Sequence, residues 1–150
     1  MIFKTLLAAA AVTSMAVPAL AQNDPIELSS QIQLVQPSDD GDTLVSPDSV
    51  VPGDTLVFQT SYSNRTGETV TDFVVATPVP PSVTLTMRSA ANLDVSVDGG
   101  TGWGQLADLT VEEETETRAA TADDVTHVRW IIAEMAPDAE GTVQYRAIVK

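Results

Sequence analysis

Residues 50–80, VVPGDTLVFQTSYSNRTGETVTDFVVATPVP, decide the fold of this 150-residue chain. In the run 55–64, apolar and aromatic side chains such as Leu56 and Phe58 fall at alternate positions, and the run that begins at Val70 alternates as well. Because successive side chains of a β-strand point to opposite faces, both runs predict strands. A proline–glycine–aspartate turn precedes the first run, NRTGE separates the two, and prolines, which cannot donate to a ladder, end the second.

The same pattern continues on both sides of this stretch. Ile26, Leu28, Ile32 and Leu34 share one side of an expected amphipathic first strand. Further short strands are expected near residues 43–46, 82–87, 93–97, 125–135 and 142–150. The acidic segment 110–124 is expected to be a long solvated connection, and no stretch has helical periodicity long enough to matter. Short alternating runs divided by Pro, Gly, Asn and Asp predict an all-β antiparallel sandwich of about seven to nine strands.

Residues 1–21, MIFKTLLAAAAVTSMAVPALA, have the composition of a cleaved secretory signal peptide. Lys4 precedes an apolar stretch, and Ala19 and Ala21 place small residues where a signal peptidase reads, so we expect cleavage after Ala21. The alternative is a retained membrane anchor, but the apolar stretch is shorter than the roughly 18 residues that a membrane-spanning helix needs. Residues 22–150 are then expected to form one domain, large enough to bury a core without crosslinks.

The composition excludes several classes of protein. The chain has no cysteine, so it has no disulfide, no thiol nucleophile and no lipid-attachment cysteine. Its 21 acidic and 7 basic residues give a formal net charge of −14, and such a field repels nucleic acid and anionic lipid headgroups. The same charge is typical of a solvated acidic surface, or it favours cationic partners or calcium.

The only histidine, His127, lies in the run VTHVRWIIAEM beside Arg129 and Trp130. A hydrolase needs a nucleophile next to its base, and the chain has neither a cysteine nor a Gly-x-Ser-x-Gly elbow. Alternation places Val128, Trp130 and Ile132 on one face, which we expect to be the core face because it carries the largest apolar side chain. His127 is therefore expected to point outward as an ordinary strand residue.

Two acidic clusters are candidate calcium sites. Asp39, Asp40 and Asp42 surround Gly41 in one loop, where several oxygens at a flexible turn would suit a hard cation. Their spacing does not match an EF-hand, and turn chemistry alone also explains this sequence. The second cluster consists of Glu112, Glu113, Glu114 and Glu116, for which solvation is the alternative.

Three further residues raise specific possibilities. Trp103, between two glycines, is either an exposed platform for sugar rings or a plug at one end of the sandwich. Asn64 begins an Asn-x-Thr glycosylation sequence, but it also ends a strand at a turn. Lys150 is the only lysine beyond the expected cleavage site, so a buried lysine–asparagine crosslink is not expected.

Residues 50–80 resemble the opening half of the exported bacterial conserved-repeat domain filed as family eleven of the domains of unknown function. The stretches VSVDGGTGWG, RAATADDVTHVRW and APDAEGTVQYRAIVK are similar to the closing half of small proteobacterial members, so the likeness covers about residues 27–150. One departure is Thr77 before Pro78, where many repeats carry aspartate. The resemblance implies an immunoglobulin-like β-sandwich in an exported protein, and it supplies no activity, catalytic residue or ligand.

These observations predict a non-enzymatic, exported cell-envelope protein with a structural or protein-interaction role, located in the periplasm, on the cell surface or outside the cell. The alternative is a glycan- or calcium-dependent binding module that uses Trp103 and the aspartate loop. We expect an unknown envelope or surface protein as partner, no nucleic acid, no membrane insertion after cleavage, and a monomer or weak oligomer. No catalytic, metal-binding or cofactor-binding residue is assigned. An unpaired edge strand is the expected means of interaction, with the strand at 26–35 either exchanged between copies or paired within its own domain.

Overall fold

The computed structural model describes residues 25–150, so the expected signal peptide at 1–21 lies outside the described part. The elements in chain order are β1 (Ile26–Gln36), β2 (Thr43–Val45), β3 (Thr55–Asn64), β4 (Val70–Pro78), β5 (Val83–Leu85), α1 (Met87–Asn92), β6 (Asp94–Ser96), the short helix η1 (Leu106–Asp108), β7 (Thr110–Glu112), β8 (Thr117–Ala119), the short helix η2 (Ala122–Asp124), β9 (His127–Met135) and β10 (Glu140–Val149). None of the helices in residues 25–150 is long and apolar enough to cross a membrane.

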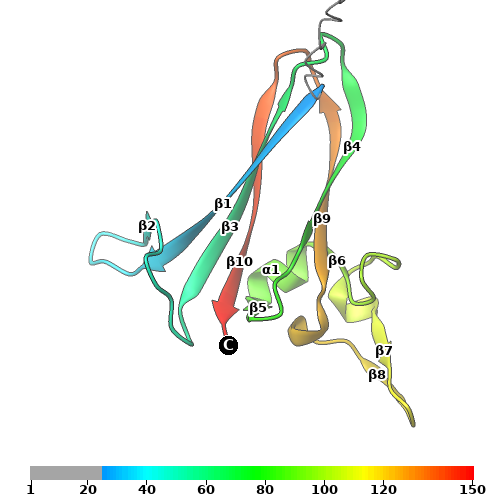
Figure 1. Cartoon of the computed structure of the whole chain (residues 1–150). Helices are drawn as coiled ribbons and strands as arrows, with labels where there is room; N and C mark the ends of the chain where they lie inside the picture. Colours follow the sequence, from blue (N-terminus) through cyan, green and yellow to red (C-terminus); the bar gives the residue numbers. More distant parts are fainter. Residues whose placement is uncertain (1–24) are drawn as a thin grey trace, which may run out of the picture.

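The strands form two main antiparallel sheets (Figure 1). One sheet has the order β2-β1-β3-β10-β5 and the other has the order β4-β9-β6. The expected all-β antiparallel sandwich is thereby confirmed. The described residues contain ten strands rather than seven to nine, because the segment expected to be a solvated connection folds into the separate hairpin β7-β8.

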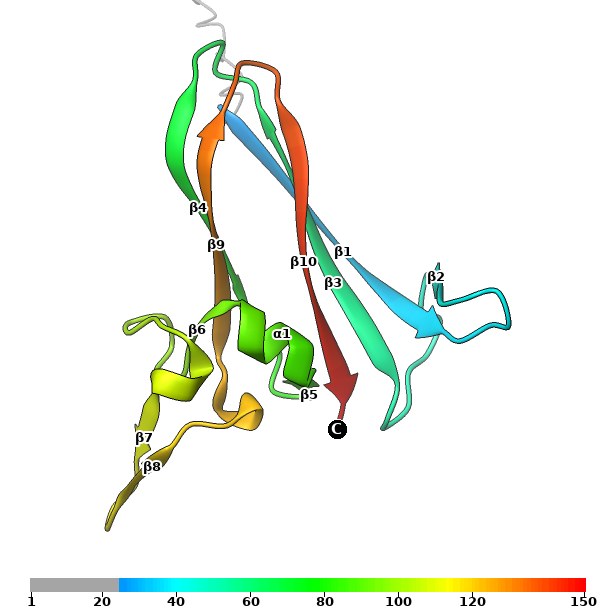
Figure 2. The ribbon, with the colours of Figure 1, turned by 180° about the vertical axis from the view of Figure 1, so that it is seen from behind.

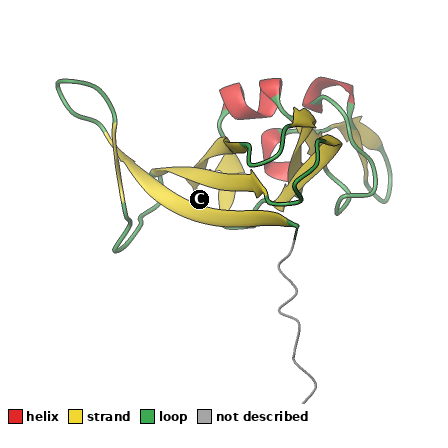
Figure 3. Cartoon of the chain, turned by 90° about the horizontal axis from the view of Figure 1, so that it is seen from above, coloured by secondary structure: helices red, strands yellow, loops and turns green. Residues whose placement is uncertain are grey.

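Strand β3 organises the larger sheet, because it pairs with β1 on one side and with β10 on the other (Figure 2). Its bounds, Thr55–Asn64, coincide with the run expected from the sequence. Strand β4 ends at Pro78, as expected for a residue that cannot donate to a ladder. The three helical segments gather on one side of the molecule, away from the loop between β1 and β2 (Figure 3).

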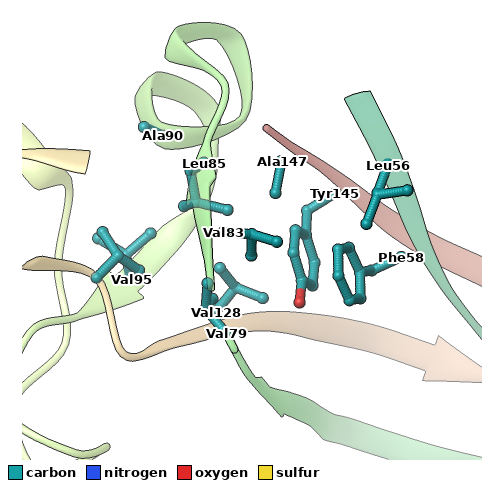
Figure 4. Close-up of a cluster of buried hydrophobic side chains, with 11 residues drawn as sticks. Leu56, Phe58, Val79, Val83, Leu85, Ala90, Val95, Val128, Tyr145 and Ala147 are labelled. Carbon is teal, nitrogen blue, oxygen red and sulfur yellow. The ribbon is translucent and has the colours of Figure 1, made fainter. Parts of the chain in front are cut away.

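The core lies between the sheets at the end that carries α1 and β5 (Figure 4). Phe58 and Tyr145 come from the larger sheet, and Val95 and Val128 face them from the smaller one. The remaining members of this cluster are Leu56, Val79, Val83, Leu85, Ala90, Val125 and Ala147. Trp130 packs against the cluster while keeping part of its surface exposed, so the face that contains Val128 and Trp130 is the core face, as expected.

The sequence interpretation missed the helix α1. Its side chains are mostly exposed, and only Ala90 is buried, so it has no apolar stripe that would reveal a helical period. The helix begins because the hydroxyl of Thr86 accepts a hydrogen bond of 3.3 Å from the amide of Ser89, which satisfies an otherwise unpaired donor of the first turn. Local capping, rather than amphipathicity, therefore defines this element.

Candidate functional site

The outer edge of β1 is a long unpaired strand edge in the described part of the chain. On one side β1 pairs with β3 from Ile26 to Leu34. On its other side β2 pairs only with Leu34, Val35 and Gln36. From Ile26 to Gln33, this edge has no strand beside it within residues 25–150. Backbone N–H and C=O groups on such an edge are available to a strand from another chain.

Two apolar side chains of β1 are exposed beside this edge. Leu28 and Ile32 lie on the same face of the strand, opposite Tyr62 and Phe58 of β3, and their exposed fractions are 54% and 46%. Figure 1 shows that β1 diverges from β4 and β9 toward its C-terminal end, so the smaller sheet does not cover that part of the strand. The alternation expected for this strand is correct, but only part of its apolar face is covered.

The other strand edges in residues 25–150 are interrupted, short or without a pair of exposed apolar side chains. Strand β4 has Asp72 in the left-handed region, with a φ of 52°, and it ends in a proline. Both features oppose the addition of a further strand. Strands β5 and β6, which end the two sheets on their other sides, have three residues each. On the side of β5, β10 is also open from Glu140 to Arg146, but in the described residues only the edge of β1 combines an open run with two exposed large apolar side chains on one face.

The edge of β1 also carries little charge. Glu27 is the only charged residue between Ile26 and Gln36, in a chain of which 19% is charged. The carboxylate of Glu27 accepts a hydrogen bond of 3.2 Å from the hydroxyl of Ser63 and lies 3.5 Å from Nε of Arg65, so it is held by its own sheet. Natural edges are often protected by charged side chains or prolines, and this one lacks both along its central part.

Trp103 is not an open platform. Its indole nitrogen donates a hydrogen bond of 2.9 Å to the carbonyl oxygen of Gly100, and the guanidinium carbon of Arg129 lies 4.6 Å from its ring centroid. Arg129 also forms an ion pair with Asp94 of β6. The ring is half-buried and held from two sides, so the structure favours a plug over the outer face of β9 rather than a sugar-stacking surface.

The loop that carries Trp103 is held by Asp98. The carboxylate of Asp98 accepts hydrogen bonds from the amides of Gly102 and Thr101, at 2.8 and 3.0 Å, and from the hydroxyl of Ser96, at 2.8 Å. These bonds, above all the one from Gly102, hold the pKa of Asp98 below its usual range. The position of Asp98 at the turn is explained by loop structure, without a ligand.

His127 lies on the outer face of β9, as expected, but it is half-buried rather than open to solvent. The ring of Trp103 meets it edge to face, with centroids 6.4 Å apart. Nδ1 of His127 lies 3.1 Å from Oγ1 of Thr126. The hydroxyl of Ser96, which is opposite His127 on β6, donates to Asp98 instead of facing the imidazole. The hydroxyl of Thr126 donates to the carbonyl oxygen of Ser96 at 3.1 Å, so it can accept a hydrogen bond from Nδ1 of His127.

In the part of the chain that the structure describes, the side chains of the aspartate loop are not grouped as metal ligands. Asp42 forms an ion pair of 3.2 Å with Arg146, and the loop is closed by Ser38, whose hydroxyl donates to the carbonyl oxygen of Gly41. Within residues 25–150, no group of three or more acidic, histidine or cysteine side chains is arranged to hold a metal ion. Asp39 and Asp40 lie exposed in the same loop.

The second acidic cluster forms the tip of the β7-β8 hairpin. Glu113 forms an ion pair of 2.6 Å with Arg118, and its amide donates to the carbonyl oxygen of Glu116 across the turn. Arg118 also holds Asp124 through two hydrogen bonds of 2.7 and 2.8 Å. The hairpin was missed because its turn contains neither glycine nor proline, although the arginine among the glutamates was a usable signal.

Asn64 is fully buried and structural. Its side-chain nitrogen donates to the carbonyl oxygens of Glu68, Met135 and Ala136, at 2.7, 3.1 and 3.0 Å. Its side-chain oxygen accepts from the amide and the hydroxyl of Thr66. The amide group thus joins the end of β3 to the end of β9, and the geometry favours the structural interpretation of this residue over glycosylation.

No family model, curated protein or solved structure matches this chain. The fold and the site therefore define the class by themselves: an all-β antiparallel sandwich whose larger sheet has a long open strand edge with exposed apolar side chains beside it. The sequence predicted the strand at this edge. It did not predict which of its two sides is open, because that depends on which strands pair with it.

Proposed function

We propose that this protein is a non-enzymatic, exported interaction module of the cell envelope, which binds its partner by strand addition at the β1 edge. The observation that carries this proposal is the combination of an eight-residue run without a strand neighbour, Ile26–Gln33, with the exposed Leu28 and Ile32 beside it. In strand addition, main-chain hydrogen bonds supply affinity and alternate side chains supply specificity.

Export is part of the proposal and is supported by the composition of residues 1–21. The high acidic content of the chain and its lack of cysteine fit an envelope protein that relies on its own core. Cell fractionation followed by N-terminal sequencing tests this part. We expect a product that begins at Gln22, and an intact N-terminus in the cytoplasmic fraction would contradict it.

The competing proposal, a glycan- or calcium-dependent binding module, receives less support. It requires an open Trp103 or a cluster of aspartates, and Trp103 is instead covered by Arg129 while Asp42 is paired with Arg146. The β1 edge needs no rearrangement to accept a strand, so it is the better supported site.

The interaction itself is tested by photocrosslinking in living cells. A photoreactive amino acid is placed at Gln31, on the β1 edge, or at Gln59, on β3. The two residues lie directly opposite each other, but β3 has β1 on one side and β10 on the other, so position 59 is one strand away from the edge. We expect covalent adducts from position 31 in clear excess over position 59. The absence of adducts at 31, or equal yields at both positions, would refute binding at this edge.

A further inference from the structure

We propose that the partner at the β1 edge is a second copy of this chain, joined across a two-fold axis beside Ser30. This inference rests on the proposed function, because it names the partner of the same edge. Two copies of β1 would run antiparallel, and the larger sheets of the two molecules would become one continuous sheet.

Side-chain geometry limits where the axis can lie. Directly opposite residues in an antiparallel pair point to the same face of the sheet, so the axis must pass beside a residue rather than between two residues. An axis beside Ser30 places Leu28 of each copy directly opposite Ile32 of the other. The interface then contains two equivalent contacts between the exposed side chains of Leu28 and Ile32, one on each side of the axis.

The neighbouring registers are less suitable. An axis beside Ser29 places Leu28 opposite a serine, and an axis beside Gln31 places Leu28 opposite Leu34, where β2 already occupies the edge. With the axis beside Ser30, the pairing runs from Glu27 to Gln33 and stops before β2 begins.

The polar side chains agree with the same register. Glu27 faces Gln33 of the second copy, so the only charged residue of the strand does not meet its own image. Ser29 faces Gln31, and Ser30 meets Ser30 at the axis. The overall charge of −14 opposes self-association, and β1 itself adds only the charge of Glu27 from each copy.

The register is tested with single cysteines, because the chain has no cysteine of its own. The full chain is expressed with its own N-terminal segment, and the exported product carrying Ser30→Cys or Ser29→Cys is treated with a short thiol-to-thiol crosslinker. We expect Ser30→Cys to give at least about fivefold more crosslinked dimer than Ser29→Cys, because only residue 30 meets its own image at the axis. Equal yields, or more dimer from Ser29→Cys, would overturn this register.

The interface is tested by sedimentation at about 0.15 M salt, where the Debye length is about 8 Å. The double variant Leu28→Lys/Ile32→Lys places lysine opposite lysine, and we expect its dimer dissociation constant to rise at least about tenfold. The matched control is Val74→Lys/Ile131→Lys, a facing pair on the smaller sheet with exposed fractions of 46% and 57%. It should leave the dimer unchanged. A wild-type protein that stays monomeric, or a dimer that survives the β1 lysines, would overturn the proposal.

Mixing experiments separate side-chain pairing from misfolding. Leu28→Glu/Ile32→Glu and Leu28→Lys/Ile32→Lys should each be monomeric and should form a mixed dimer when combined, because glutamate then faces lysine at both positions. If the mixture fails to associate while both variants remain folded, the proposal that the partner is a second copy of this chain is contradicted. If the photocrosslinked adduct at position 31 contains a different protein and never this chain, the second copy is refuted while strand addition at β1 stands.

Discussion

The rings of Phe58 and Tyr145 stack with their centroids 4.7 Å apart and their planes 3° apart. The two residues lie directly opposite each other on β3 and β10, so the stack joins the central strands of the larger sheet. Trp130 of the smaller sheet adds its ring 6.4 Å from Tyr145, and the hydroxyl of Tyr145 donates to the carbonyl oxygen of Pro78 at 3.3 Å. Tyr145 therefore contacts both layers of the sandwich.

Truncation of Tyr145 should be strongly destabilising. We expect Tyr145→Ala to lower the free energy of unfolding by about 3–5 kcal/mol, as large-to-small changes of buried aromatic residues do. Tyr145→Phe keeps the stack and loses one hydrogen bond, so it should cost about 1 kcal/mol. Urea denaturation measures both values, and similar losses for the two variants would show that the stack contributes little.

Burial raises the pKa of Tyr145 above its usual value. An unfolded tyrosine ionises near about pH 10, so the folded state retains a proton that the unfolded state loses. The stabilisation is complete below about pH 10 and declines as the pH rises through the higher folded pKa. We expect the urea midpoint to fall more between pH 8 and pH 11 in the wild type than in Tyr145→Phe. Equal declines would assign the alkaline sensitivity to other groups.

Arg118 holds the pKa of the Asp124 carboxyl well below its usual range, mainly through direct hydrogen bonds. Asp124 also caps η2 by accepting from the amide and hydroxyl of Thr121. Because the folded pKa is lowered, its stabilising contribution is present above about pH 4 and is lost as the pH falls below that value.

Asp124→Asn should therefore cost about 1 kcal/mol at pH 7, a modest value because a partly exposed pair is screened by solvent. The difference between wild type and variant should shrink as the pH is lowered from about 5 to 2. Thermal unfolding across this range measures it. A constant difference would mean that the carboxylate charge is not what stabilises η2.

Loss of the Asn64 amide should leave buried carbonyl groups of two strand ends without a donor. We expect Asn64→Ala to lower the free energy of unfolding by about 3 kcal/mol. Asn92→Ala is the matched control, because Asn92 is exposed at the end of α1 and donates only to the carbonyl oxygen of Arg88. Its change should stay within about 0.5 kcal/mol. Chemical denaturation of both variants compares the two sites, and equal losses would contradict the structural role of Asn64.

Calcium should not stabilise the protein. A site with a Kd of about 0.1 mM would add about 2.7 kcal/mol at 10 mM calcium and would raise Tm by several degrees. Asp42 is paired with Arg146, and Asp39 and Asp40 are not grouped with it as metal ligands. We therefore expect Tm to be the same in 10 mM calcium and in excess chelator. A rise in Tm that Asp40→Asn abolishes would restore the aspartate loop as a calcium site.

Strands with strong alternation and clear turns were predictable from the sequence. Strand β3 matches its expected bounds because an apolar period of two is bracketed by the turns at Gly53 and Gly67. Helix α1 and the β7-β8 hairpin were not predictable in this way, because a capping hydroxyl and an ion pair define them. These features act between particular side chains and leave no periodic signal.

The sequence predicted the strand that forms the candidate site, but not the exposure of its side chains. Alternation correctly placed Leu28 and Ile32 on one face of a strand. Whether they are buried depends on how far the smaller sheet extends over β1, and that extent is set by the pairing of β4 with β9, distant in the chain. Likewise, the sequence alone does not decide whether Trp103 is a platform or a plug, because the position of Arg129 at its ring follows from the tertiary structure.

Strand β10, the last strand of the described chain, lies in the middle of the larger sheet, where Thr55 pairs with Ile148 and Leu85 pairs with Ala147. The sheet cannot close until nearly all of the chain before it is available, and pairing across so long a stretch is intrinsically slow. A chain held at a ribosome or a membrane pore would thus remain open along β3 until its final strand arrived. Under the export that we propose, delayed closure of this kind would keep the chain unfolded while it is threaded across the membrane.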